Sequence, residues 1–174
     1  MVGIDSNVLS YLVEPLDSRY DPSMDHSSLK PERIAIVRIY FYKGLSYYVT
    51  PTVRLEYQRI RNTVRRDLHD RLCQFLLLDP WSLNQTAAHK RTSDLLTNHS
   101  DLDDCSIVAE AELMGLQALI TCDGDLITHL RPLTNVLIIR PSDYWKSIGI
   151  QSGGKPVIAP ASSNPLSTLN WWRV

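Results

Sequence analysis

The chain has few of the residues that build disulfide frameworks or membrane spans. Its 174 residues include three cysteines, and no two of them form the C-x-x-C pair of a zinc or redox site. No stretch reaches the roughly 20 apolar residues that cross a bilayer. The apolar run at the start contains Asp5, which argues against a signal peptide. We therefore expect a cytoplasmic protein with reduced thiols and no membrane contact.

An excess of charge of one sign is also absent, because the formal net charge is only -1. Charge is nevertheless unevenly distributed. Six arginines lie between Arg54 and Arg71, whereas Asp101 to Asp125 contains seven acids and no lysine or arginine. The arginines are typical of the solvated side of a helix, and RNA phosphate binding is the alternative. The acidic segment is a candidate metal-binding region.

Alternating helical and strand patterns predict the fold class. Short apolar runs predict strands at residues 1–5, 47–49, 119–121 and 136–139. Apolar residues spaced by three or four predict helices after residue 6 and at 34–42, 52–77, 84–98, 101–114 and 125–131. Ser6 or Asn7 is expected to cap the first of these helices. The order predicts a three-layer α/β/α sandwich with a mainly parallel sheet.

Two segments fall outside this alternation. Glu14 to Glu32 is rich in proline, serine and aspartate, which is typical of a surface loop or a poorly ordered insertion, and we assign it no catalytic role. Residues 149–174 form a proline- and serine-rich tail after a domain of residues 1–148. Trp171 and Trp172 in this tail are costly to leave in water, so we expect them to dock on the domain or on a partner.

Acidic residues recur where predicted strands end or helices begin. Asp5 and Asp123 follow strands, and the carboxyl ends of parallel strands meet at one edge of a sheet. Asp104 shares a helix face with apolar residues at i+3, i+4 and i+7, and Glu56 lies on the apolar stripe of residues 52–77. Four carboxylates gathered at one edge repel each other unless a cation lies between them. The pattern predicts an enzyme that depends on Mg²⁺ or Mn²⁺.

Each side chain has an expected role at this site. The prediction makes Asp5, Asp104 and Asp123 metal ligands, directly or through water, and Glu56 the ligand of a second ion or the group that orients the nucleophile. Asn7 and Thr121 are expected to support these carboxylates by hydrogen bonds. Asp125 is either an additional ligand or a helix cap.

Structural roles compete with this interpretation. A single aspartate at a strand-to-helix turn is more often a cap than a ligand. Glu56 would be neutralised if Arg59 paired with it. The histidines show no metal-binding spacing, so we treat His26, His69, His99 and His129 as structural or surface residues, and His89 as a weak candidate for RNA contact.

In their order and spacing, five motifs resemble the signature of PIN-domain nucleases. The family's first strand ends in an aspartate that is followed two residues later by Asn, Thr or Ser. The resemblance covers about residues 1–148. Its motifs are Ile4-Asp5-Ser-Asn7-Val8-Leu9, Val53-x-x-Glu56 after Thr50-Pro51, Asp104-x-x-Ile107-x-Ala109-x-Ala111 with Gly115, Thr121-x-Asp123-x-Asp125-Leu126, and Arg140-Pro141-Ser-Asp-Tyr144. The loop at 14–32 and the tail are longer than in the shortest toxin members.

The resemblance implies a ribonuclease that hydrolyses RNA phosphodiester bonds with one or two divalent ions. Many members are VapC-like toxins, so an antitoxin partner and a homodimer are further expectations by analogy. Two alternatives stay open. One is a non-catalytic PIN-like module that binds RNA or protein. The other is a phosphoryl-transfer enzyme with Asp5 as nucleophile, although that class places a second aspartate where this chain has Asn7.

Overall fold

The predicted parallel sheet is present in the computed structural model, which describes residues 1–16, 20–44, 47–78 and 83–174. All strand pairs are parallel, and the order across the sheet is β3-β2-β1-β4-β5. The strands are short and apolar, as expected where helices cover a parallel sheet. Their bounds are β1 (Val2–Ile4), β2 (Tyr47–Tyr48), β3 (Leu77–Leu78), β4 (Ala118–Ile120) and β5 (Leu137–Ile139).

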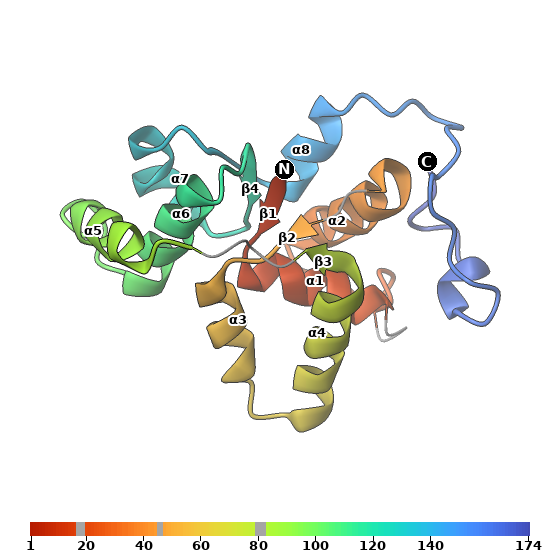
Figure 1. Cartoon of the computed structure of the whole chain (residues 1–174). Coiled ribbons are helices and arrows are strands. Elements are labelled where there is room, and N and C mark those ends of the chain that lie inside the picture. The colour runs from red at the N-terminus through yellow and green to blue at the C-terminus, as the bar shows by residue number, and fades with distance from the viewer. Residues whose placement is uncertain (17–19, 45–46, 79–82) are drawn as a thin grey trace.

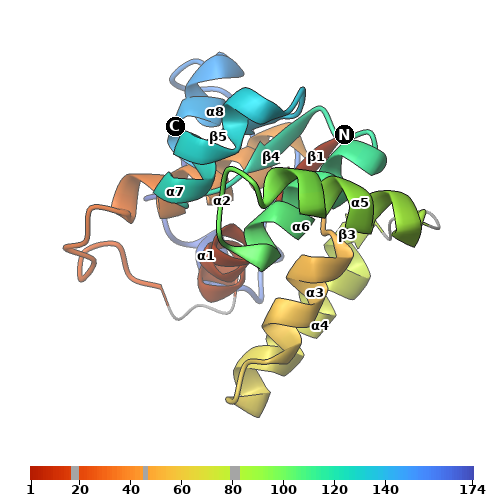
Figure 2. The ribbon, with the colours of Figure 1, turned by 90° about the vertical axis from the view of Figure 1, so that its left-hand side faces the viewer.

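Helices cover both faces of this sheet, which confirms the predicted α/β class. Figures 1 and 2 show α5 and α6 on one face and α2 and α8 on the other. The helices are α1 (Ser6–Leu16), α2 (Lys30–Lys43), α3 (Pro51–Gln58), α4 (Thr63–Leu76), α5 (Gln85–Leu95), α6 (Leu102–Leu113), α7 (Gly124–His129) and α8 (Pro141–Ser147). Each of these segments is too short or too polar for a helix that passes through a bilayer.

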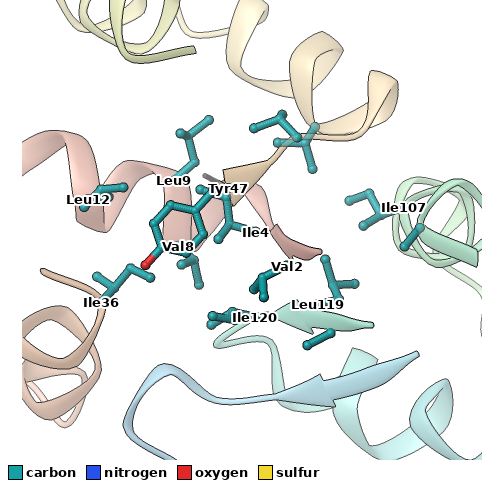
Figure 3. Close-up of a cluster of buried hydrophobic side chains, with 14 of the residues drawn as sticks. Val2, Ile4, Val8, Leu9, Leu12, Ile36, Tyr47, Ile107, Leu119 and Ile120 are labelled. Carbon is teal, nitrogen blue, oxygen red and sulfur yellow. The ribbon is translucent and has the colours of Figure 1, made fainter. Parts of the chain in front are cut away.

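The core lies between the central strands and the helices beside them (Figure 3). Ile4 and Ile120 are paired residues of β1 and β4, and both are fully buried. Ile107 reaches the core from α6, which confirms that the predicted apolar face of this helix packs on the sheet. The carboxyl ends of β1 and β4 are thereby held in register, so the residues that follow them are neighbours.

The single long helix predicted for residues 52–77 is wrong, because the chain turns back between α3 and α4. The amide of Arg59 bonds to the carbonyl of Glu56 and ends α3, and the Asn62 side chain accepts the amide of Arg65 at the start of α4. Figure 2 shows the two helices side by side as a hairpin that projects from the sheet. The spacing of apolar residues continues across the turn, so hydrophobic periodicity alone did not reveal the break.

The loop predicted at 14–32 is shorter than expected. Helix α1 continues to Leu16, Glu32 lies in the first turn of α2, and residues 17–19 lie outside the described part. Residues 20–29 are organised around Asp25. Its carboxylate accepts hydrogen bonds from Ser27, Tyr20 and Arg33, and these hold its pKa far below the usual range.

The C-terminal tail lies against α2. Trp172 is fully buried, with its ring centroid 4.4 Å from that of Phe41, and its indole N–H donates to the carbonyl of Leu166. Arg38 of α2 donates hydrogen bonds to the carbonyls of residues 171–173. The tail therefore docks on the domain in this structure, while the division of the chain after residue 148 stays a prediction.

Candidate active site

Asp5 follows β1 and is almost fully buried, with 3% of its surface exposed. Its Oδ1 accepts the Ser6 amide at 2.6 Å, and its Oδ2 accepts the Asn7 side-chain amide and the Thr121 hydroxyl, each at 2.7 Å. The support predicted from Asn7 and Thr121 is therefore present. The expected cap is wrong, because α1 begins at Ser6 and its first turn is capped by Asp5. Burial raises the pKa of Asp5, these hydrogen bonds lower it, and the charge of Asp123 raises it further.

Asp123 is linked to Asp5 through Thr121. The Thr121 hydroxyl donates to Asp5 and also accepts the Asp123 amide at 2.9 Å. The Oδ1 atom of Asp123 accepts the amides of Asp125 and Leu126, so it caps α7. Within the described residues, its Oδ2 atom accepts no hydrogen bond. Asp123 can therefore act as a cap through one oxygen and as a ligand through the other.

Asp104 lies in the first turn of α6, which Asp101 caps. Its Oδ2 is 2.9 Å from Nε2 of His99, whose ring stacks on that of His129 with centroids 5.7 Å apart. The pKa of Asp104 is raised to about 6, chiefly by burial and then by the charges of Asp101, Asp123 and Asp5, against the hydrogen bond from His99. Sequence reasoning treated His99 as structural or surface. Its only signal was its place in the turn just before α6.

Glu56 faces the aspartates from α3, which packs against α6. Its Oε2 atom is buried and has no hydrogen-bond partner in the described part of the chain. Burial raises its pKa to about 7; a hydrogen bond with Ser6 opposes this rise, and the charges of Asp5, Asp103 and Asp104 add to it. Arg59 does not neutralise Glu56, because its guanidinium bonds to Asp103 at 2.8 Å.

These four carboxylates, Asp5, Glu56, Asp104 and Asp123, are called the acidic rim below. Charges within this group add to the rise in the pKa values of Asp5, Glu56 and Asp104. Within the ranges that the structure describes, however, no three Asp, Glu, His or Cys side chains are grouped as the direct ligands of one ion. Mg²⁺ commonly takes only one or two carboxylates and keeps several waters. The donor chemistry and the buried Glu56 oxygen fit such a hydrated ion better than a closed shell of protein ligands.

A pocket of about 350 Å³ opens beside Asp123. Its walls come from Asn7 and Tyr11 of α1, from Leu29 before α2, and from residues 122–125. Asp125 is exposed, and its carboxylate makes no hydrogen bond or ion pair within the described residues. Of the acidic rim, only Asp123 borders this pocket.

No family model matches the chain, and no curated protein does. Among solved structures, the chain is similar to FitAcB from Neisseria gonorrhoeae, with 18% identity over 81% of this chain and 98% of that one, at a TM-score of 0.48. It is also similar to VapBC2 from Rickettsia felis, solved bound to a DNA fragment from their promoter, with 11% identity over 79% of this chain and 97% of that one, at a TM-score of 0.49. Neither likeness is close enough to assign a family or a function, so the function is argued from the chain's own residues.

Proposed function

We propose that the chain is a metal-dependent ribonuclease whose active site is the acidic rim. The observation that carries this proposal is the buried Oε2 atom of Glu56, which has no hydrogen-bond partner among the residues that the structure describes and lies in the field of other carboxylates. Such a group is unfavourable when ionised, because burial removes its solvation and its neighbours repel its charge. A divalent cation between the carboxylates would relieve both effects.

Asp5, Asp104 and Asp123 would hold Mg²⁺ or Mn²⁺, directly or through water. A bound ion would polarise the phosphodiester and make a bound water more acidic. Glu56 has a pKa of about 7, near the value that suits a general base at neutral pH, so it would accept a proton from the attacking water or hold a second ion. Thr121 and Asn7 would keep Asp5 oriented, and His99 would do the same for Asp104.

RNA as the substrate is supported by the likeness of the chain's motifs to those of PIN-domain nucleases. The same likeness is the ground for proposing a toxin that an antitoxin partner holds inactive, and a homodimer. The proposal of RNA cleavage does not depend on either assembly.

The two alternatives are not favoured equally by the structure. An aspartyl nucleophile is disfavoured, because Asn7 stands where that class places its second aspartate, and the Asn7 side-chain amide donates to Asp5. A non-catalytic module that binds RNA or protein would leave the unpartnered Glu56 oxygen without a role. No observation specifically favours that module.

The test is metal-dependent cleavage of single-stranded RNA by the purified chain. We expect cleavage with Mg²⁺ or Mn²⁺, none with a chelator, and a loss of at least about 100-fold in Asp104→Asn, since even residues that only support a metal ligand contribute 10- to 100-fold. Calorimetric titration with Mn²⁺ should show weaker binding in the same variant.

Asp143→Asn is the matched control, because Asp143 is also an acid in the first turn of a helix. It should cleave like the unmodified chain, and circular dichroism should show that both variants are folded. Full activity in Asp104→Asn would overturn the site assignment. RNA binding without cleavage under any metal condition would favour the non-catalytic module.

A further inference from the structure

The pocket beside Asp123 combines polar and apolar lining residues. Its volume of about 350 Å³ falls at the lower end of the range of such sites. Tyr11, Leu29 and Cys122 supply its apolar walls. The walls suit a flat, partly apolar ligand better than a free phosphate.

Tyr11 is held in place by its neighbours. The guanidinium carbon of Arg33 lies 4.7 Å from the centroid of its ring, and Arg33 is itself fixed by Asp25 at 2.9 Å. Bases of single-stranded RNA commonly stack on aromatic rings of proteins. Arg33 covers one face of the Tyr11 ring, so a base would stack on the other face. A ring held in this way loses little side-chain entropy when a base stacks on it.

Only part of the polar lining is available to a ligand. The Asn7 side chain is engaged at both ends, because it donates to Asp5 and accepts the Cys122 amide. The Oδ1 atom of Asp123 caps α7. Asp125 lines the pocket, and within the described residues its carboxylate has no partner. It therefore offers two acceptor oxygens and no donor.

We propose that this pocket binds a guanine base of the RNA strand, stacked on Tyr11 and bonded to Asp125. Guanine is the RNA base whose Watson–Crick edge presents two neighbouring N–H donors, on N1 and N2, to match the two oxygens of a carboxylate. Asp123 belongs both to the pocket and to the acidic rim, so the bound guanine would lie next to the bond that is cut. The inference rests on the proposed ribonuclease function and adds a base preference to it.

Binding is tested without cleavage, in protein that carries Asp104→Asn. Fluorescence titrations compare short single-stranded RNAs that differ at one central base, with guanosine monophosphate as a separate arm. We expect the guanine-containing strand to bind about tenfold more tightly than its adenine, cytosine or uracil counterparts, and Tyr11→Leu to lose about tenfold, as stacking contributions predict. Tyr11→Phe keeps the ring and should keep most of the affinity.

Asp125→Asn replaces one acceptor oxygen by a donor, so it should abolish the preference for guanine without unfolding an exposed site. Asp143→Asn, away from the pocket lining, should keep it. Equal affinity for all four strands would overturn the inference, and so would tighter binding of free guanosine monophosphate than of the strand. Metal-dependent cleavage without a base preference would overturn the proposal of guanine binding and leave the ribonuclease proposal standing. A guanine preference in a chain that cleaves no RNA would overturn the ribonuclease proposal and leave guanine binding standing.

Discussion

Two sets of buried or half-buried carboxylates in this molecule differ in how their oxygens are satisfied. Glu110 accepts the hydroxyl and the amide of Thr52 at 2.8 and 2.9 Å, at the start of α3. Glu32 accepts the hydroxyl and the amide of Ser142 at 2.9 and 2.8 Å, at the start of α8. In both cases the partner follows a proline at the beginning of a helix, where amides lack intrahelical acceptors. These glutamates join distant elements and leave no oxygen without a partner.

The acidic rim is built differently. One oxygen of Glu56 is buried and has no partner within the ranges that the structure describes, and the pKa values of Glu56 and Asp104 are raised to about 7 and about 6. The comparison teaches that burial alone does not mark a functional carboxylate. Glu110, Glu32 and Asp5 have donors from the chain for both oxygens. Within the described residues, Glu56 and Asp123 each keep one oxygen that the chain leaves unfilled.

The largest effect on stability should come from a glutamate whose two oxygens both have donors. Glu110→Ala leaves the buried amide and hydroxyl of Thr52 without an acceptor, so we expect the free energy of unfolding to fall by about 2–4 kcal/mol. Urea unfolding monitored by circular dichroism measures this free energy. A loss as small as that of the exposed Asp143→Ala would break the comparison, because Glu110 would then have no structural role.

Thr121→Val tests whether the rim depends on the hydroxyl that links Asp5 to Asp123. Valine keeps the shape of the threonine side chain but lacks its hydroxyl group. We therefore expect the free energy of unfolding to fall by about 1–2 kcal/mol and Mn²⁺ to bind roughly tenfold more weakly. Thr52→Val is the matched control, since it removes a hydroxyl from Glu110 instead. It should lower stability and leave Mn²⁺ binding unchanged; an equal loss of Mn²⁺ affinity in both variants would contradict a local role of Thr121.

Glu56→Gln should change the free energy of unfolding least of the three variants, and it should raise this free energy instead of lowering it. The folded-state pKa of about 7 lies above the ordinary value of 4.5, so Glu56 stabilises the fold below about pH 4.5, and this contribution is lost as the pH rises through 7. Without metal, the variant should therefore be more stable than the unmodified chain by about 1 kcal/mol near pH 8, after allowance for solvent screening.

The two proteins should converge in stability near pH 4, where Glu56 is protonated in both the folded and the unfolded state. Thermal unfolding at both pH values, with a chelator present, measures the difference. A variant that is less stable than the unmodified chain near pH 8 would show that the Glu56 charge is satisfied in the fold.

Particular residues show what could be predicted from the sequence. The short apolar runs at residues 1–5 and 119–121 correctly predicted strands of a parallel sheet, because such runs stay buried only inside a covered sheet. That these two strands are adjacent came from the structure. The spacing around Asp104 correctly predicted the buried face of α6, because a helical period of 3.6 depends on local geometry alone. The chain reversal before Asn62 was missed, because the apolar positions of α3 and α4 happen to keep one spacing across the turn.

The missed partners of carboxylates are all remote or weakly signalled in the sequence. Glu110 and Thr52 are separated by 58 positions, and Glu32 and Ser142 by 110. The bond between His99 and Asp104 spans only five positions, but it depends on how the turn between α5 and α6 is placed. Sequence patterns report the period of an element and do not report which side chains meet between elements.

The sequence by itself determined the alternation of strands and helices, the parallel sheet and the positions of acids at strand ends, because backbone geometry and hydrophobic burial act through local spacing. Only the tertiary structure decided how each carboxylate is satisfied. Packing brings Ser142 to Glu32 and Thr52 to Glu110, and it leaves one Glu56 oxygen buried among negative charges. The charge state of a buried acid depends on which groups folding places within a few ångströms of it. The separation of residues along the chain does not reveal these neighbours.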